Sequence, residues 1–148
     1  MDAKHKALTH QIIKAFYNVY NTLGYGFLEK VYEKAIAIEL STLGLKVEQQ
    51  ARITVYYAGQ IIGEYFADLL INNTVIVELK ATRTIATEHE AQLLNYLKAT
   101  TFEVGLLLNF GPKPQIKRKT YDNERKGDLA WTTEKNTDDT ENTDQDNN

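Results

Sequence analysis

The chain has 148 residues, enough for one domain with a buried core, and its 43% hydrophobic and 25% charged residues are ordinary for a soluble globular protein. The absence of cysteine excludes a disulfide framework, a thiolate metal site and a cysteine nucleophile, and it is compatible with a reducing cytosol. There is no signal-peptide pattern and no apolar run of roughly 20 residues, so we expect a soluble, cytoplasmic protein without a membrane partner.

The charge is distributed unevenly along the chain. Residues 1–120 contain 14 Lys and Arg against 11 Asp and Glu, whereas residues 121–148 contain 3 against 9, which together give the net charge of −3. The final segment, EKNTDDTENTDQDNN, has no apolar side chain that could stabilise a folded state. We therefore expect one domain over residues 1–122 and an acidic, disordered tail over residues 123–148. The tail either keeps the protein soluble or imitates a polyanion and competes for a basic groove.

Two helices are expected first. Apolar residues recur at spacings of three and four from His5 to Asn21, and NTLGYG, with two glycines, ends this helix. The second helix is expected from Phe27 to Leu43. Glu29, Tyr32 and Glu33 share one of its faces. We expect another face to be the apolar one, formed by Leu28, Val31, Ala35, Ile38 and Leu40.

The sequence changes its pattern after Gly44. LKVEQQARITVYYAG, IIGEYFADLLIN and TVIVELK read as strands joined by short turns, which predicts an antiparallel meander. TEHEAQLLNYLKAT then reads as a helix, FEVGLLLNF as a strand and QIKRKTY as a short edge strand. The order helix, helix, three strands, helix, strand predicts an α/β fold with helices packed on a mixed sheet.

The third strand carries an acid and a base that its apolar neighbours do not explain. Glu78 and Lys80 are two residues apart and so project from the same face. Asp68 precedes the intervening turn by about as many residues as Glu78 follows it, which places the two carboxylates close together. Two adjacent carboxylates repel unless one keeps its proton or a cation lies between them, and oxygen ligands suit Mg²⁺ or Mn²⁺.

Such a metal beside a lysine is suited to phosphodiester hydrolysis, because the metal polarises the phosphoryl oxygen and Lys80 can orient water or stabilise negative charge. The pattern D-x₉-E-x-K is short and permissive, however. The alternative interpretation is that Glu78 and Lys80 form a solvent-facing pair and that Asp68 is a turn residue.

Four segments in order resemble a known family: GFLEKVY, ADLLI, VELKA and EAQLLNYLK. Over about residues 5–120 the sequence resembles the PD-(D/E)xK nuclease superfamily, and GFLEKVY (Gly26–Tyr32) resembles the motif of the GxxExxY proteins within it. The resemblance implies a restriction-endonuclease-like core, α-β-β-β-α-β, with a mixed central sheet flanked by helices. It also implies a Mg²⁺- or Mn²⁺-dependent nuclease that hydrolyses phosphodiester bonds in nucleic acid, with DNA favoured over RNA.

The resemblance also implies residue roles. Metal ligands would be Glu29, Asp68 and Glu78, with the main-chain carbonyl of Leu79 often completing the shell. Lys80 would be the catalytic lysine. Gln92 and Tyr96 match the QxxxY element, so Gln92 would act on the water or phosphate and Tyr96 would bind substrate. The sequence departs from the pattern at Ala67, where Pro is usual, a change of little chemical weight.

Further basic residues are candidates for binding phosphate. Arg83 follows the third strand, and Lys113, Lys117, Arg118 and Lys119 form a basic edge that either holds phosphates or protects an edge strand from aggregation. A homodimer is compatible with nuclease function, because one site cuts one strand. The alternative function is a catalytically inactive nuclease-fold module that binds nucleic acid or a protein partner.

Overall fold

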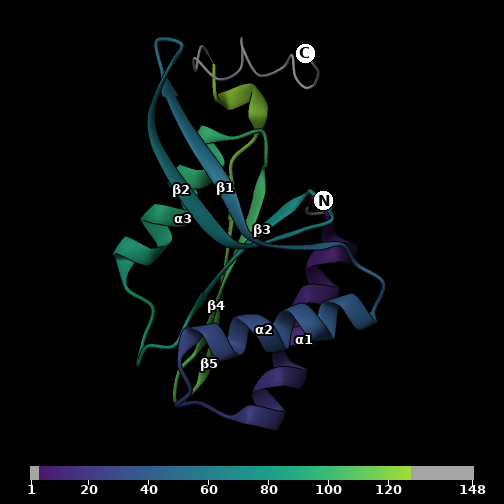
Figure 1. The fold of residues 1–148 in the computed structure, drawn as a ribbon. Coiled ribbons are helices and arrows are strands. Elements are labelled where there is room, and N and C mark those ends of the chain that lie inside the picture. The colour runs from purple at the N-terminus through teal and green to yellow at the C-terminus, as the bar shows by residue number, and fades with distance from the viewer. Residues whose placement is uncertain (1–3, 128–148) are drawn as a thin grey trace.

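The N-terminal part of the chain forms the two expected helices. In the computed structural model, which describes residues 4–127, they are α1 (Lys6–Leu23) and α2 (Glu29–Thr42) (Figure 1). The connection contains Gly24 and Gly26, whose φ angles of 68° and 114° would strain any residue with a side chain. These glycines allow the chain to reverse sharply between the helices.

The strands form one five-stranded sheet in the order β1-β2-β3-β4-β5. All neighbours are antiparallel except β3 and β4, which are parallel and are connected through α3. The antiparallel meander and the mixed sheet predicted from the sequence are therefore confirmed. The elements are β1 (Val47–Tyr57), β2 (Gln60–Ile71), β3 (Val75–Lys80), α3 (Thr87–Ala99), β4 (Val104–Phe110), β5 (Pro114–Thr120) and the short 3₁₀ helix η1 (Asn123–Arg125).

The sheet is covered on both faces, which gives three layers (Figure 1). Val77 and Leu106 belong to the core beneath α1 and α2, while their neighbours Ile76 and Leu107 belong to a second core beneath α3. Because side chains alternate across a strand, β3 and β4 need apolar residues on both faces, and their nearly continuous apolar runs supply them. The expected restriction-endonuclease-like arrangement of helices around a mixed sheet is confirmed.

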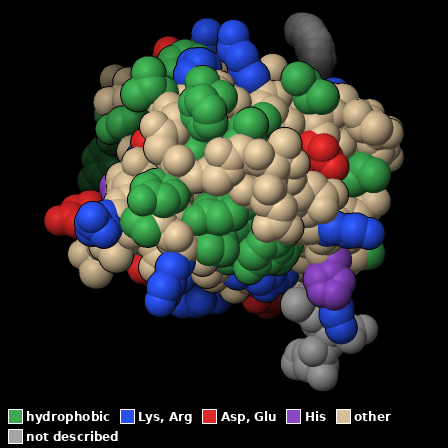
Figure 2. Space-filling model, turned by 90° about the horizontal axis from the view of Figure 1, so that it is seen from below, with side chains coloured by type: hydrophobic (Ala, Val, Ile, Leu, Met, Phe, Trp, Pro, Cys, Tyr) green, Lys and Arg blue, Asp and Glu red, His purple; other side chains and the backbone are tan. Residues whose placement is uncertain are grey.

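The apolar face predicted for α2 is wrong in part. Leu40 is buried as expected, but Leu28, Val31 and Ile38 are exposed. The helix buries Tyr32 and Ile36 together with Leu40, at spacings of four residues. Tyr32 stacks on Phe110, with ring centroids 3.9 Å apart and an interplanar angle of 10°. Periodicity alone does not choose between two apolar stripes on one helix, and this long-range contact decides the choice. The surface seen from below, the side on which α1 and α2 lie, carries hydrophobic patches (Figure 2). The large hydrophobic residues that are exposed on α2 and just before it are Leu28, Val31 and Ile38.

The β1–β2 hairpin extends beyond the rest of the sheet. β1 and β2 pair from Val47 opposite Ile71 to Tyr57 opposite Gln60, whereas β2 and β3 pair only over three residues of each strand, from Leu69 to Ile71 and from Val75 to Val77. The outer part of the hairpin therefore leaves the sheet and projects past α3, at the top of Figure 1.

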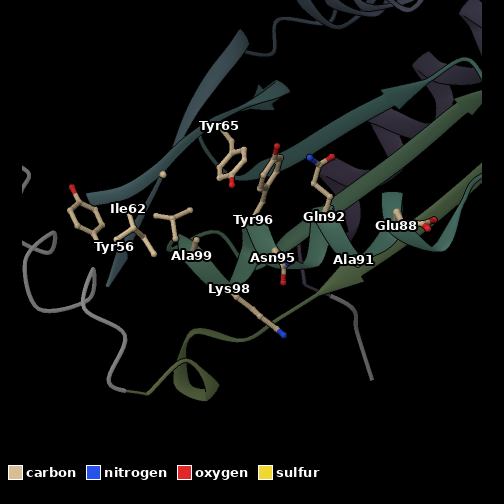
Figure 3. A pocket seen from close by; sticks show the side chains of 12 residues that line it. Tyr56, Ile62, Tyr65, Glu88, Ala91, Gln92, Asn95, Tyr96, Lys98 and Ala99 are labelled. Carbon is tan, nitrogen blue, oxygen red and sulfur yellow. The ribbon is translucent and has the colours of Figure 1, made fainter. Parts of the chain in front are cut away.

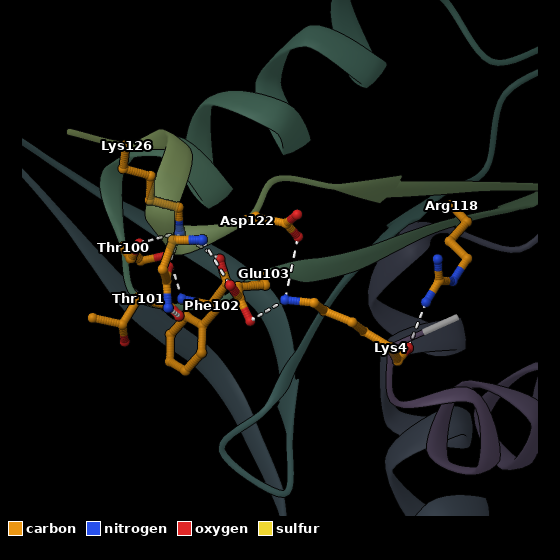
Figure 4. A network of polar contacts seen from close by, with 9 residues as sticks. Lys4, Thr100, Thr101, Phe102, Glu103, Arg118, Asp122 and Lys126 are labelled. Atoms are coloured by element: carbon orange, nitrogen blue, oxygen red, sulfur yellow. Dashed lines mark hydrogen bonds and ion pairs between the residues drawn. The ribbon is translucent and has the colours of Figure 1, made fainter. Parts of the chain in front are cut away.

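Polar contacts connect the two ends of the described chain (Figure 4). The Lys4 Nζ lies 3.1 Å from Glu103 Oε1 and 3.3 Å from Asp122 Oδ1, and Arg118 donates a hydrogen bond to the Lys4 carbonyl. The buried Lys126 Nζ donates to Thr100 O, Phe102 O and Asn123 Oδ1 at 2.6, 2.9 and 2.5 Å. The segment after β5 is thus fixed against the α3–β4 connection.

Within residues 4–127, no helix is long and apolar enough to cross a membrane. The predicted acidic tail, apart from residues 123–127, lies outside the described residues.

Candidate active site

The candidate site lies where β2 and β3 separate. Continuing the register beyond Leu69 opposite Val77 would pair Asp68 with Glu78, but the ladder stops before them. Side chains replace the main-chain hydrogen bonds of the ladder here. Glu78 Oε2 accepts the Asp68 N–H at 2.9 Å, and Asp68 Oδ2 accepts the Leu79 N–H at 2.8 Å. This reciprocal pair of bonds holds both carboxylates at the opening between the strands, as the spacing of the sequence predicted.

Glu78 is buried, and none of residues 4–127 forms an ion pair with it. The residue is 6% exposed, and among residues 4–127 the Asp68 amide is its only hydrogen-bond donor. Burial, followed by the charge of Asp68, raises the pKa of Glu78 to about 8, although the positive charge of Lys80 acts in the opposite direction. The alternative of a solvent-facing Glu78–Lys80 pair is therefore wrong for Glu78, and Lys80 itself is half-buried.

Glu29 reaches this region from the first turn of α2. Its negative charge contributes to the raised pKa of Glu78, which places it within electrostatic range of the carboxylate pair. Tyr32 holds the loop that precedes Glu29, because its hydroxyl donates to Gly24 O at 2.8 Å and accepts the Phe27 N–H at 3.2 Å. In GFLEKVY, Gly26 and Tyr32 thus shape the loop, and Glu29 is an exposed acid whose charge acts on Glu78.

Helix α3 brings a third element to the site. Tyr96 is 6% exposed, and burial, then the charges of Glu78 and Asp68, raise its pKa to about 12. Its hydroxyl is therefore protonated at neutral pH and able to donate a hydrogen bond near the carboxylates. Gln92, one turn earlier on α3, is exposed on the same side of the helix (Figure 3).

Among residues 4–127, the remaining basic candidates form no hydrogen bond or ion pair with Asp68 or Glu78. Arg83 is exposed in the β3–α3 connection, and within the described part of the chain it makes no hydrogen bond or ion pair with a site residue. On the basic edge, Lys119 pairs with Glu90 at 2.7 Å and Arg118 bonds the Lys4 carbonyl. These two side chains are thus partly occupied by contacts within the protein.

The comparisons with known proteins agree with this geometry. A family model described as the PD-(D/E)XK nuclease superfamily matches residues 6–119. The chain belongs to this superfamily. A solved structure titled "Crystal structure of SSO0001" is similar, with a TM-score of 0.50 and 16% identity over 71% of this chain and 58% of that chain. At this identity the likeness concerns the fold alone, and the chain spans less than two thirds of the length of that structure. No curated protein matches the chain significantly.

The PD-(D/E)XK motif residues offer a donor set suited to a hard divalent cation. Asp68, Glu78 and the Leu79 carbonyl are all oxygen ligands, and one Glu78 oxygen has no donor among the described residues. Burial and then the charge of Asp68 raise the pKa of Glu78, and a cation would relieve the repulsion between the two carboxylates. Within residues 4–127, however, no three or more His, Asp or Glu side chains are grouped closely enough to chelate an ion by themselves. A divalent cation here would therefore be held by the carboxylates of Asp68 and Glu78 and by the Leu79 carbonyl, with Glu29 as a more distant acid.

Sequence reasoning missed two residues that contact this candidate site. Glu33 is 4% exposed, and its Oε1 accepts a 2.9 Å hydrogen bond from Gln50 Nε2, which also lies 3.4 Å from Asp68 Oδ1. Lys30 pairs with Glu33 at 3.3 Å. Gln50 has a positive φ of 53°, unusual for a non-glycine residue inside a strand. The i, i+4 spacing of Glu29 and Glu33 was visible in the sequence, whereas nothing local indicated the role of Gln50.

Proposed function

We propose that the protein is a metal-dependent nuclease that hydrolyses phosphodiester bonds. The observation that carries this proposal is the buried, incompletely bonded Glu78 carboxylate next to Asp68 and Lys80, at the opening between β2 and β3. Maintaining such a group is costly for a fold unless a ligand uses it, and perturbed carboxylates in an opening are typical of functional sites. Membership of the superfamily supports the same interpretation.

Each residue would have a defined part in the reaction. Asp68 and Glu78 would hold Mg²⁺ or Mn²⁺ together with the Leu79 carbonyl, and Glu29 would contribute directly or through water. When bound, the cation would polarise the phosphoryl oxygen and lower the pKa of water. Lys80 would orient the attacking water and stabilise the negative charge that develops on the phosphoryl group.

Helix α3 would position the substrate. Gln92 would orient the phosphate or the water, and Tyr96, protonated at neutral pH, would donate a hydrogen bond to a phosphate oxygen. Arg83 would add a peripheral, salt-dependent contact with the backbone of the nucleic acid. We further propose DNA as the polymer and a cytoplasmic protein, and a homodimer is compatible with this function.

The test is a cleavage assay with labelled DNA and RNA in the presence of Mg²⁺ or Mn²⁺, with EDTA as the metal-free condition. Glu78→Gln and Lys80→Ala should each lower the cleavage rate by at least about a hundredfold. The matched control is Glu64→Gln, which removes a surface carboxylate that pairs with Arg52 at 3.9 Å on the same hairpin. We expect it to leave the rate unchanged.

Two outcomes would contradict the proposal. Unchanged cleavage by Glu78→Gln or Lys80→Ala would remove that residue from the mechanism. A protein that binds nucleic acid equally well with and without divalent ions, and cuts none, would instead be the inactive binding module.

A further inference from the structure

A groove separates the projecting β1–β2 hairpin from α3 (Figure 3). Its volume is about 570 Å³, within the usual range for small-molecule sites and large enough for a nucleotide. The hairpin contributes Tyr56, Ile62 and Tyr65 to its wall, and α3 contributes Ala91, Gln92 and Tyr96. The groove is therefore mainly apolar and aromatic, with a few polar groups along one wall.

An aromatic pair lies at the centre of the groove. The rings of Tyr65 and Tyr96 have centroids 5.9 Å apart and are tilted by 42°, so neither ring covers the face of the other (Figure 3). Tyr65 remains 48% exposed. A Cβ at Gly63 would approach Tyr65 Cε2 to 3.2 Å, so the glycine gives this ring room beside the strand. The result is a half-exposed aromatic face directed into a concave site.

This groove shares two residues with the candidate active site. The ring of Tyr96 meets Tyr65 in the groove, and the charges of Glu78 and Asp68 act on its hydroxyl. Gln92 also lines the groove. A ligand that fills the groove would therefore contact both of the residues that α3 contributes to the candidate site.

We propose that this groove binds one unpaired nucleobase by stacking on Tyr65, and that the substrate class is consequently single-stranded nucleic acid. The proposal rests on the nuclease function proposed above and specifies its substrate. An unpaired base can offer a free face to an aromatic ring, whereas a base inside a duplex is already stacked on both faces. Every base can stack on an aromatic ring, so the groove would distinguish single strands from duplexes and would not distinguish one base sequence from another.

The experiment measures binding rather than cleavage. Fluorescence anisotropy of a labelled oligothymidylate of about 12 nucleotides is recorded with EDTA present, and a duplex of equal length is measured in parallel. Wild-type protein should bind the single strand more tightly than the duplex. Tyr65→Ala should weaken single-strand binding by at least about fivefold, as expected for the loss of one stacked base, while Tyr65→Phe should keep the affinity.

The chain offers a matched control at the next position. Phe66 is also 48% exposed, but side chains alternate across the strand, so its ring lies on the opposite face of the hairpin. Phe66→Ala should change the affinity less than about twofold. Ala91→Leu, which fills the groove from an exposed position of α3 without removing any packing, should weaken binding as Tyr65→Ala does.

The outcomes separate this inference from the proposed function. Metal-dependent cleavage together with equal binding by wild type, Tyr65→Ala and Ala91→Leu would overturn the base-binding groove and leave the nuclease intact. Tighter binding of duplex than of single strand would also overturn it. If the wild type neither binds nor cuts any nucleic acid, the proposed function fails and the inference fails with it.

Discussion

In the metal-free protein, the pH dependence of the free energy of unfolding should reveal the titration of the Glu78 carboxyl group. Its pKa of about 8 lies above the value of 4.5 expected for an exposed glutamate. Between these two pH values the folded protein keeps a proton that the unfolded chain has released. The stability that this group contributes is therefore fully present below about pH 4.5 and is lost as the pH rises to about 8.

The magnitude follows from the two pKa values. Each pH unit inside this interval corresponds to about 1.4 kcal/mol, so by pH 7 the free energy of unfolding should have fallen by about 3 kcal/mol because of Glu78 alone. Glu78→Gln keeps an oxygen that can accept the Asp68 N–H but has no proton to release. Between pH 4 and pH 7, the difference in the free energy of unfolding between the variant and wild type should therefore change by about 3 kcal/mol in favour of the variant.

The assay is urea denaturation of both proteins across this pH interval, with EDTA present and Glu64→Gln as the surface control. Mg²⁺ or Mn²⁺ near pH 8 should then stabilise the wild type and not Glu78→Gln, because a ligand stabilises only the form that binds it. Parallel pH profiles for wild type and Glu78→Gln would refute the reasoning, since they would mean that Glu78 titrates as an exposed acid.

Three other substitutions test parts of the site and fold. Tyr32→Phe should lower the free energy of unfolding by about 1–3 kcal/mol in denaturation experiments, because the part-buried Gly24 carbonyl loses its donor. Tyr17→Phe, at an exposed position, should change it little. Gln50→Ala should reduce the cleavage rate without a comparable loss of stability, because it removes the side-chain amide that hydrogen-bonds both Glu33 and Asp68. An unchanged cleavage rate would mean that Gln50 has no part in the site. Lys126→Ala should lower the free energy of unfolding by about 1–3 kcal/mol, because the carbonyls of Thr100 and Phe102 lose a donor. An unchanged free energy of unfolding would mean that water replaces the Nζ equally well.

The fold was predictable where local pattern and length determine it. The alternating and apolar runs between Gly44 and Lys80, with turns at AGQ and NN, specify three short-linked strands, and such strands pair as an antiparallel meander. The helix before β4 then requires a crossover, which makes β3 and β4 parallel. The closeness of Asp68 and Glu78 followed from their distances to the same turn.

The rest depends on contacts between distant segments. The burial of Tyr32 follows from its stacking on Phe110, which lies at the end of β4, and no window of the sequence around α2 contains that information. The role of Gln50 depends on the separation of β2 from β3 and on the position of α2 above it. The groove beside Tyr65 exists because the hairpin is longer than the sheet it leaves, a relation that only the assembled fold defines.

The residues of GFLEKVY have different roles, and this difference affects how related chains should be interpreted. Gly26 is needed for its backbone angle and Tyr32 for fixing the loop, so both would be retained by any chain that keeps this fold, including one that has lost catalysis. The charge of Glu29, by contrast, acts on Glu78. Under the proposed function, a chain with the glycine and tyrosine intact but with neutral residues in place of Glu29, Asp68, Glu78 and Lys80 would keep the fold and lose the groups that hold the metal and act on the phosphate. The glycine and tyrosine would then indicate the fold, and the charges at the strand opening would indicate the activity.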